Sequence, residues 1–410
     1  MNISREYKMK CRHCNNILKN TLIDLGCSPL SNGYLKKNEL LKPEIYYPLI
    51  IKVCNKCWLV QTVDYAKKEK IFDEKYAYFS STSLSWLRHA ENYTNKIIKK
   101  LNINSSSFVI EIASNDGYLL KNFIKLNIPC LGIEPTKSTA QSAEKKGIKV
   151  LQTFFTEKIG IKLASENIKS DLIIANNVLA HVPDINDFCA GLKHILKDEG
   201  TITIEFPHVK KLLEKVQFDT IYHEHFSYLS IISISKVFKL AGLRIWDVEK
   251  ISTHGGSLRV YVCHIRSTRI EKNRVAILIN EELKFGMNKI ETYQDFEKRA
   301  CIIKNNFISK LILLKNKKMK VVGFGAAAKG NTFLNFAGIG RDLIPVIFDG
   351  TVAKQNKYTP GSRIPILSSK LIDKSNPDCV VIFAWNLSNE IKTEVNLKLK
   401  YPVKFILPLN

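Results

Sequence analysis

The chain has 410 residues, of which 45% are hydrophobic and 10% aromatic; this is enough for several hydrophobic cores and excludes an intrinsically disordered protein. The formal net charge of +24 is compatible with a polyanionic ligand, but the basic residues are scattered rather than gathered in one stripe. No apolar run approaches the roughly 18 residues of a membrane span, and no signal-peptide core stands near the N-terminus. We therefore expect a cytoplasmic, monomeric protein of more than one domain that binds neither nucleic acid nor a membrane.

Two CxxC pairs stand near the N-terminus, Cys11 with Cys14 and Cys54 with Cys57. This spacing is typical of two zinc knuckles, whose four thiolates together complete a tetrahedral structural site. The alternative is a set of four free structural cysteines. The spacing favours a Zn²⁺ ion bound by all four residues.

The stretch between the two CxxC pairs is longer than a minimal zinc ribbon requires. Residues 25–34 within it are therefore expected to loop out and to have a role of their own. His13 and Cys27 lie near the pairs and could be mistaken for metal ligands.

Residues 72–86 are dense in aromatic and hydroxyl side chains, and residues 87–101 follow at helical spacing. Two interpretations of the aromatic segment remain open. It packs the zinc module onto the next domain, or it lines an adenosine pocket ahead of the first strand of the core. The second interpretation makes Tyr76, Phe79 and Ser80 candidate cofactor-binding residues.

The middle of the chain alternates short apolar runs with amphipathic segments, which is typical of a doubly wound, Rossmann-like α/β core with a parallel sheet. The expected strands are residues 108–113, 130–134, 148–151, 171–175 and 201–205.

A small, polar turn that includes Gly117 follows the first strand, and Glu134 ends the second. In such a sheet the turn opens a helix whose N–H groups face a ligand, and the carboxylate can bind both hydroxyls of a ribose. The turn lacks the third glycine of a dinucleotide fingerprint, which favours S-adenosylmethionine; an ordinary α/β turn is the alternative. The candidate cofactor-binding residues at this edge are Glu111, Ala113, Asn115, Gly117, Glu134, Pro135, Asn176 and Asn177.

A second group of reactive side chains comes from His181 and from the segment Tyr222-His-Glu-His225. Tyr222 and His225 share a face at i, i+3 if the segment is helical or a helical turn, and Glu224 can support an imidazole. The HxH pair has no evident third metal ligand, so general acid–base chemistry is favoured. For His181, a buried and hydrogen-bonded histidine without a catalytic role is the alternative.

Residues 268–316 are helical and charged in pattern, and a third unit begins near residue 319. Gly323, Gly325 and Ala328 match G-x-G-x-x-G/A, and Asp349 ends the next apolar run, which alone indicates a nicotinamide dehydrogenase. Lys329 instead favours a terminal diphosphate at the helix opening. We expect residues 1–68 to form a zinc-binding module, 69–267 the cofactor-binding domain, and 268–410 a helical connector with a second Rossmann-like domain.

These motifs together resemble the nucleotide-sugar C-methyltransferases that make branched deoxysugars such as tetronitrose and mycarose, and the resemblance runs nearly end to end. It rests on the zinc pairs, Asp24–Leu35, Glu111–Tyr118, Tyr222–His225, His254–Arg259 and Gly325–Asn331. It implies a zinc module, an S-adenosylmethionine-binding fold and a C-terminal domain that helps to hold the nucleotide sugar. His208 departs from the aromatic or aliphatic residue that the resemblance leads us to expect.

The resemblance also implies which residues surround the sugar ring. The implied catalytic residues are His181, Tyr222, Glu224 and His225. The candidate substrate-binding residues are His254, Lys329, Asn331, Asp349, Trp385 and Asn386.

The expected reaction is C-methylation of a 4-keto deoxy nucleotide sugar, dTDP-linked and modified at C3. His225 or Tyr222 removes the proton beside the ketone, and His181 or Tyr222 stabilises charge on the C4 oxygen. This mechanism needs no catalytic metal, so we expect the zinc ion to be structural. The alternatives are an NAD-dependent nucleotide-sugar oxidoreductase and a zinc-ribbon protein that binds nucleic acid.

Overall fold

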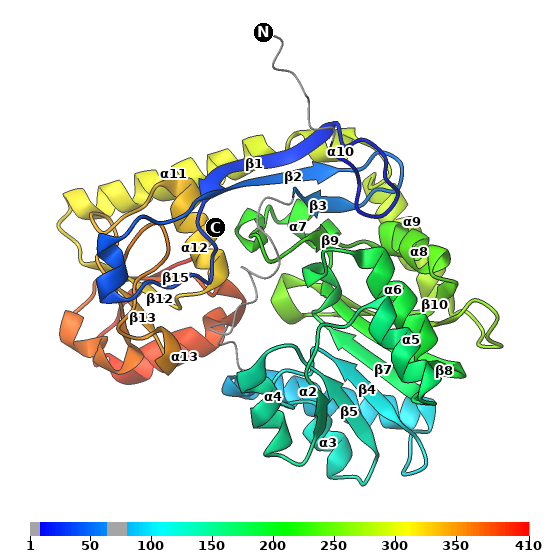
Figure 1. Cartoon of the computed structure of the whole chain (residues 1–410). Helices are drawn as coiled ribbons and strands as arrows, with labels where there is room; N and C mark the ends of the chain where they lie inside the picture. The colour runs from blue at the N-terminus through cyan, green and yellow to red at the C-terminus, as the bar shows by residue number, and fades with distance from the viewer. Residues whose placement is uncertain (1–8, 64–79, 410) are drawn as a thin grey trace.

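The computed structural model describes residues 9–63 and 80–409, so the predicted cofactor residues Tyr76 and Phe79 lie outside the described residues. Three sheets organise the chain, and they correspond to the N-terminal, central and C-terminal parts of the sequence (Figure 1). Among the described residues, no helix combines the length and apolar character needed to cross a membrane.

The N-terminal sheet is antiparallel and has the order β1-β2-β3-β9. Its strands are β1 (Asn20–Ser28), β2 (Tyr47–Val53), β3 (Val60–Thr62) and β9 (Ser227–Tyr228), and the short helix η1 (Lys37–Leu41) lies between the first two. In sequence, β9 belongs to the middle of the chain. The zinc module therefore shares a sheet with the segment that follows Tyr222.

The central sheet has the order β10-β11-β8-β7-β4-β5-β6, with β10 and β11 antiparallel and the other five strands parallel to one another. The parallel strands confirm the five predicted from apolar runs. The strands are β4 (Val109–Ile112), β5 (Cys130–Ile133), β6 (Lys149–Leu151), β7 (Ser170–Asn176), β8 (Leu196–Pro207), β10 (Leu243–Ile251) and β11 (Ser257–His264).

Helices cover both faces of the central sheet, which confirms the doubly wound architecture. Val109 of β4 packs in one core with α2 and α3, whereas the next residue, Ile110, packs in another with α5, α6, α8 and α9. The helices of this part are η2 (Ser80–Thr82), α2 (Leu84–Leu101), α3 (Leu120–Ile124), α4 (Lys137–Glu144), α5 (Glu157–Ser165), η3 (Leu179–His181), α6 (Ile185–His194), α7 (Val209–Glu214), η4 (Phe218–Thr220), α8 (Ile231–Leu240) and η5 (Thr253–Gly255).

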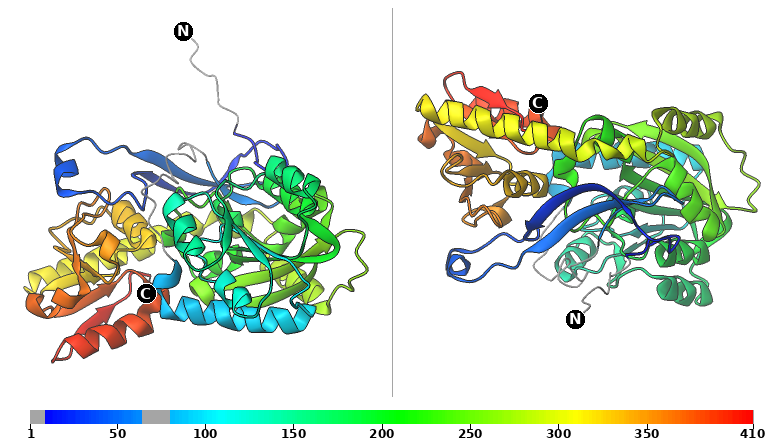
Figure 2. Two further views of the ribbon diagram at one scale, coloured as in Figure 1. Left: turned by 60° about the horizontal axis from the view of Figure 1, so that its bottom comes forward. Right: turned by 90° about the horizontal axis from the view of Figure 1, so that it is seen from above.

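The C-terminal sheet is parallel and has the order β14-β13-β12-β15-β16, which confirms a second Rossmann-like unit. The long α11 runs between this unit and the central one (Figure 2). The connector helices are α9 (Asn273–Phe285), α10 (Glu291–Gln294) and α11 (Phe296–Asn316), followed by β12 (Val321–Phe324), α12 (Ala328–Ala337), β13 (Ile347–Asp349), η6 (Val352–Lys354), β14 (Ile366–Ser368), η7 (Ser369–Leu371), η8 (Asp373–Ser375), β15 (Cys379–Ile382), η9 (Trp385–Leu387), α13 (Ser388–Lys398) and β16 (Lys404–Ile406).

The histidine at position 208 has a structural explanation. Its Nε2 donates to Glu282 Oε1 at 2.7 Å, and the same buried carboxylate accepts from the backbone N–H groups of Ile231 and Ile232 at 2.8 and 2.9 Å. Those N–H groups begin α8 and have no partner within the helix, so a carboxylate stabilises them. His208 and Glu282 thus join the end of β8, the start of α8 and the connector helix α9.

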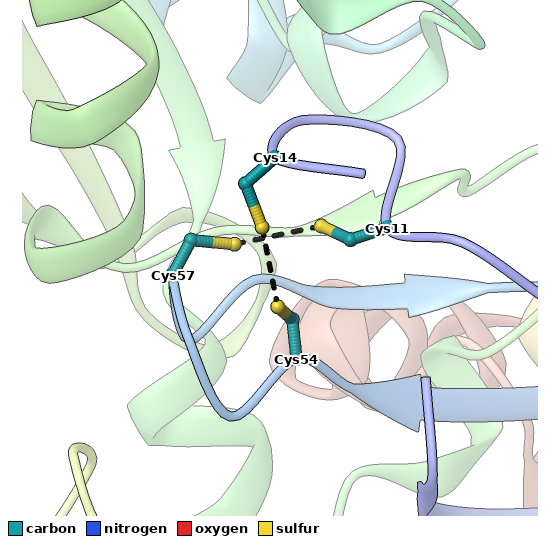
Figure 3. A group of neighbouring side chains, drawn as sticks. All are labelled: Cys11, Cys14, Cys54 and Cys57. Carbon is teal, nitrogen blue, oxygen red and sulfur yellow. Dashed lines mark hydrogen bonds between the residues drawn. The ribbon is translucent and has the colours of Figure 1, made fainter. Parts of the chain in front are cut away.

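The four predicted cysteine ligands lie together, with their sulfur atoms all within 4.8 Å of one another (Figure 3). Zinc–sulfur bonds of about 2.3 Å in a tetrahedron place the sulfurs about 3.8 Å apart, so the cluster fits a Zn²⁺ ion. The cysteines of the described residues form no disulfide. Cys27 is exposed, and His13 binds Asn186 through Nδ1 at 2.8 Å, so neither belongs to the cluster.

The first zinc knuckle is bonded to the central domain through the two residues between its cysteines. Arg12 donates to the carbonyl oxygens of Pro183 at 2.6 Å and Thr62 at 2.8 Å. His13 and Asn186 exchange two hydrogen bonds, and Asn186 lies in the first turn of α6. The knuckle therefore holds the loop that follows His181.

We predict that Cys54→Ser reduces zinc content from one ion per chain to none and lowers the midpoint of thermal unfolding, because a structural zinc site stabilises the fold that forms it. Elemental analysis and thermal scans measure the two quantities. The matched control is Cys27→Ser, which removes an exposed thiol outside the cluster and should keep the ion. Zinc retained at full occupancy in Cys54→Ser would contradict the assignment of the ligands.

Candidate active site

The predicted cofactor turn follows β4 and has an unusual backbone. Ala113, Asn115 and Gly117 have φ values of +52°, +50° and +74°. A Cβ on Gly117 would lie 2.3 Å from Ile148 Cδ1 and 3.1 Å from Ala143 Cβ. Glycine is therefore required here by the close packing of the turn on its own domain as well as by the positive φ.

Glu134, which directly follows β5 and precedes Pro135, is buried against this turn. Its Oε2 accepts from the N–H of Asn115 at 2.9 Å, and its Oε1 accepts from the N–H of Thr136 and the hydroxyl of Thr139 at 2.9 and 3.0 Å. An ionised carboxylate has about four acceptor positions, so capacity remains for a ribose hydroxyl. Glu134 thus fixes the turn and can still bind a nucleoside.

Further polar groups surround the turn. The N–H of Ser80 donates to Asn115 Oδ1 at 2.9 Å, so this predicted cofactor-binding residue lies against the turn. Burial, followed by the charges of Glu134 and Asp116, raises the pKa of Glu111 well above its usual range, which favours the protonated form of this carboxyl. A neutral carboxyl can donate a hydrogen bond to a ligand.

The two asparagines predicted at the end of β7 also carry buried polar atoms. Asn177 has φ of +55°, and both of its side-chain amide atoms lack a hydrogen-bond partner among the described residues, as does Asn176 Oδ1. Buried polar groups are normally paired, so these atoms are suited to bind a ligand.

Trp86 is a residue of this region that we did not predict individually, although it ends the aromatic segment. Its ring centroid lies 4.9 Å from that of His89, 5.3 Å from that of His254 and 6.2 Å from that of Tyr118, which follows Gly117. Trp86 therefore connects the cofactor turn with the predicted substrate residue His254.

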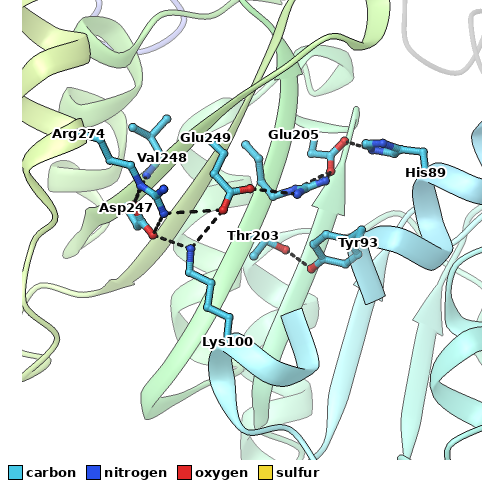
Figure 4. Close-up of polar contacts among 10 residues, drawn as sticks. His89, Tyr93, Lys100, Thr203, Glu205, Asp247, Val248, Glu249 and Arg274 are labelled. Atoms are coloured by element: carbon cyan, nitrogen blue, oxygen red, sulfur yellow. Dashed lines mark hydrogen bonds and ion pairs between the residues drawn. The ribbon is translucent and has the colours of Figure 1, made fainter. Parts of the chain in front are cut away.

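A network of polar contacts joins α2, the helix that carries Trp86, to the central sheet (Figure 4). His89 donates through Nε2 to Glu205 Oε2 at 2.9 Å, and Arg259 donates through Nε to Glu205 Oε1 at 2.7 Å. Tyr93, one turn along α2 from His89, bonds Thr203 at 2.6 Å. These contacts fasten one side of α2 to β8 and β11 and so fix the position of Trp86.

His225 lies at the centre of the predicted catalytic group. Its ring centroid is 3.9 Å from that of Tyr222, 4.7 Å from that of His181 and 6.0 Å from that of Tyr228. Its Nδ1 lies 2.8 Å from the carbonyl oxygen of Thr220, which can only accept, so Nδ1 carries the hydrogen. The lone pair of Nε2 is then available to take a proton.

The support of an imidazole that we predicted for Glu224 comes from its backbone, which hydrogen-bonds the ring of His181, and not from its carboxylate. Residues 222–225 form a turn in which His225 N–H donates to Tyr222 O at 2.9 Å, and Glu224 Oε1 accepts from Asn32 Nδ2 at 3.1 Å. Burial raises the pKa of Glu224 to about 7. The carbonyl of Thr220, rather than Glu224, orients His225.

His223 lies on the other side of the same segment. It donates through Nε2 to Pro48 O at 3.2 Å and has an edge contact with the ring of Tyr47, both from the N-terminal sheet. The two histidines of the HxH pair therefore bind different partners. This arrangement agrees with acid–base chemistry and not with a shared metal.

The imidazoles of the group are neutral at pH 7. Burial lowers the pKa of His181 to about 4, and burial, then the charge of His181, holds the pKa of His225 well below its usual range. Burial, then the charge of Lys329, lowers the pKa of His254 to about 4. These histidines are available as proton acceptors and hydrogen-bonding groups, not as permanent cations.

Four predicted substrate residues lie together at the junction of the domains. Lys329, at the start of α12, donates to Asn386 Oδ1 at 2.9 Å, and its Nζ lies 4.3 Å from the centroid of the Trp385 ring. His254 is close enough for the charge of Lys329 to lower the pKa of its imidazole. The Trp385 indole N–H donates to Asp219 at 2.5 Å, an acid that the sequence did not single out.

The other two predicted substrate residues make contacts within the protein. Asn331 donates through Nδ2 to Ser31 O at 2.7 Å. Asp349 accepts through Oδ2 from the N–H of Ala326 and through Oδ1 from the N–H of Thr351, both at 2.7 Å. Asp349 thus holds the glycine-rich turn of the C-terminal unit, and Asn331 holds the N-terminal module.

The segment expected to loop out of the zinc module joins three parts of the chain. Asn32 hydrogen-bonds Glu224 of residues 222–225, which we call the predicted catalytic segment. Tyr34 donates through its hydroxyl to the carbonyl oxygen of Ala326 at 2.6 Å, in the C-terminal unit. The hydroxyl of Ser31 lies 3.2 Å from that of Thr332, whose Oγ1 bonds Ile221 O at 2.9 Å. The loop therefore determines how the C-terminal unit meets the catalytic segment.

Comparison with known proteins agrees with this architecture. Residues 11–72 match the family model of a zinc binding domain, residues 86–248 that of a methyltransferase domain, and residues 252–410 that of a C-methyltransferase C-terminal domain. The curated C-methyltransferase NovU of Streptomyces niveus is 30% identical over 400 residues, which cover 98% of this chain and 95% of NovU.

Two solved structures are similar to parts of the chain. One is an S-adenosylmethionine-dependent methyltransferase from Clostridium acetobutylicum, at 14% identity and a TM-score of 0.36 over 43% of this chain and 92% of that one. The other is magnesium protoporphyrin IX methyltransferase from Synechocystis, at 14% identity and a TM-score of 0.36 over 46% of this chain and 91% of that one. On the evidence of the family models and of NovU, the chain belongs to the C-methyltransferase family and is an S-adenosylmethionine-dependent enzyme with an N-terminal zinc-binding domain.

Proposed function

We propose that the protein methylates a carbon atom of a 4-keto deoxy nucleotide sugar, dTDP-linked and modified at C3, in the biosynthesis of a branched-chain sugar. The observation that carries the proposal is the convergence of two groups from distant parts of the chain. His225, next to Tyr222, lies within electrostatic reach of His254 and of Lys329, which begins a helix of the C-terminal unit. A proton acceptor thus lies near a cation suited to a diphosphate.

Carbon methylation requires a carbon nucleophile, and a ketone provides one by acidifying the neighbouring C–H bond. S-adenosylmethionine supplies the electrophilic methyl group. The residues of the chain have to remove the proton and stabilise the negative charge that develops on the C4 oxygen. A zinc ion held by the four cysteines would have a structural role, because the sheet beside the cluster pairs with β9, which follows residues 222–225.

His225 suits the role of base. Its Nε2 lone pair is available because Nδ1 donates to Thr220 O, and its pKa, held below the usual range by burial and by His181, keeps the ring unprotonated at neutral pH. Tyr222 has a phenolic O–H, which can donate to the C4 oxygen. The close approach of the two rings supports the proposal that both groups act on one substrate carbon and its ketone.

Lys329 suits the role of diphosphate ligand. It stands in the first turn of α12, where backbone N–H groups and the helix dipole favour an anion. Trp385 offers an apolar face beside it, and Asn386 and His254 offer polar groups.

A panel of 4-keto deoxy nucleotide sugars, varied in base and in substitution, tests the proposal. Each is incubated with the enzyme and S-adenosylmethionine, and mass spectrometry and NMR identify the product. We expect one added methyl group at C3 of a dTDP-sugar and no dependence on NAD. A methyl group at another carbon or on oxygen would contradict the proposal.

We predict that Glu134→Ala weakens S-adenosylmethionine binding by about 1.5–3 kcal/mol, the value of a charge-assisted hydrogen bond, and leaves nucleotide-sugar affinity nearly unchanged. Calorimetry with each ligand measures both. The matched control is Glu144→Ala, which removes an exposed carboxylate from α4 and should change neither affinity. An equal loss for both ligands in Glu134→Ala would indicate a folding defect instead.

We predict that His225→Asn abolishes both methyl transfer and exchange of the proton beside the ketone, whereas Tyr222→Phe only slows them. Because His225 is active unprotonated and its pKa is lowered, the acid limb of the wild-type kcat/KM profile should lie below pH 6.5. Exchange is measured by mass spectrometry in D2O with S-adenosylhomocysteine in place of the methyl donor.

The control for this experiment is His194→Asn, a partly exposed histidine on α6 that should retain exchange. Exchange that persists in His225→Asn and disappears in Tyr222→Phe would reverse the two assignments.

A further inference from the structure

A buried aspartate stands at the junction between the catalytic segment and the C-terminal unit. Asp219 lies in η4 and is only 2% exposed. Its Oδ2 accepts from the indole N–H of Trp385 at 2.5 Å, although the two residues are 166 positions apart. Its Oδ1 is buried without a hydrogen-bond partner among the described residues. Burying a carboxylate is costly unless hydrogen bonds or an opposite charge stabilise it, so the role of Asp219 depends on its neighbours.

Trp385 is fixed on more than one side. Its N–H binds Asp219, and Lys329 Nζ lies 4.3 Å from its ring centroid. On another side, a Cβ at Gly255 would come within 2.5 Å of the ring, so the glycine permits the indole to pack closely on the loop that carries His254. Trp385 therefore holds Asp219 and Lys329 in a fixed relation across the domain boundary.

The other titratable groups that act on Lys329 are imidazoles, whose charge when ionised is opposite to that of the Asp219 carboxylate. His254 in η5 and His225 in the catalytic segment both interact with the charge of Lys329, and a protonated imidazole at either place would repel it. Burial lowers the pKa of Lys329, and the carboxylate of Asp219 raises it. Burial raises the pKa of Asp219 itself to about 6, so this carboxylate is ionised at neutral pH.

We propose that Asp219 is a positioning residue and the counter-ion of Lys329: anchored on the indole of Trp385, its carboxylate keeps the Lys329 ammonium charged and in place to bind a nucleoside diphosphate. The inference rests on the proposed function, because it assigns the diphosphate of the substrate to Lys329. Without the carboxylate, a lysine surrounded by imidazoles and an indole would lose its proton more readily. The free enzyme would then bind an anion only after taking up a proton.

The first experiment measures the charge of Lys329 without any substrate. The full-length protein is trace-labelled with acetic anhydride at a series of pH values, and peptide mass spectrometry gives the midpoint for Lys329, since only a neutral amine reacts. We expect the midpoint to fall by about one pH unit or more in Asp219→Asn, because loss of a nearby opposite charge has that size of effect. Asp219→Asn keeps an oxygen for the Trp385 N–H, and Asp219→Glu should recover most of the shift.

The second experiment measures how ligand affinity depends on pH. For Asp219→Asn, affinity for a nucleoside diphosphate glucose should fall about tenfold per pH unit above the new Lys329 midpoint, at pH values where the wild-type affinity is still constant. Affinity for S-adenosylmethionine should not change. Glu281→Gln, which removes a carboxylate paired with Lys250 at the surface, is the control for a general charge effect and should move neither midpoint nor affinity.

The two experiments separate this inference from the proposed function. A lowered Lys329 midpoint in Asp219→Asn together with the pH-dependent loss of affinity supports the inference. An unchanged midpoint in a variant that binds S-adenosylmethionine normally overturns it, even if the wild type binds nucleotide sugars. A lowered midpoint in a protein whose wild type binds no nucleoside diphosphate sugar supports the counter-ion role and overturns the proposed function.

Discussion

The pairing of β3 with β9 is the interaction on which the rest of the site depends. Through it, Val60 lies opposite Tyr228 and Gln61 opposite Ser227, so a strand of the zinc module pairs with the strand that comes just after the predicted catalytic segment. The hydroxyl of Thr62 adds a hydrogen bond to His225 O at 2.5 Å. An isolated two-residue strand is not stable in water, so the sheet must supply the order. The four-cysteine cluster holds the turns beside this sheet. Through the sheet it thus helps to fix residues 222–225, although these residues are not ligands of the cluster.

The site combines neutral imidazoles with one cation that has its own carboxylate. A base that is unprotonated at pH 7 is ready to act, but its low pKa makes it a weak base in the free enzyme. In the reaction that we propose, the enolate and the diphosphate of the substrate would both add negative charge near His225, and negative charge favours the protonated form of an imidazole. The basicity of His225 is therefore expected to rise when the substrate is present. This arrangement confines proton transfer to the occupied site and requires no permanent charge on the ring.

The sequence predicted well those features that depend on local pattern. The five parallel strands were visible because strands buried on both faces are continuous apolar runs, and the metal ligands were visible from the spacing of Cys11, Cys14, Cys54 and Cys57. It could not reveal contacts between distant residues, such as Asp219 with Trp385 or Asn32 with Glu224. The partner of the Glu224 carboxylate could not be predicted for the same reason: it is Asn32, 192 residues away in the sequence. Trp86 was within reach of prediction, since it lay in a segment already marked as aromatic.

The C-terminal unit shows why a glycine fingerprint indicates a fold before it indicates a ligand. Asp349 ends β13, where a dinucleotide-binding protein would present an acid to a ribose. Here both carboxylate oxygens accept backbone N–H groups, and Lys354 Nζ lies 3.8 Å away. Lys354 and Tyr34 also both donate to Ala326 O, so the turn is bonded to the zinc module. The acid that completes the fingerprint therefore stabilises the turn and its junction with the N-terminal module, which leaves Lys329 at the helix opening as the charged group suited to a diphosphate.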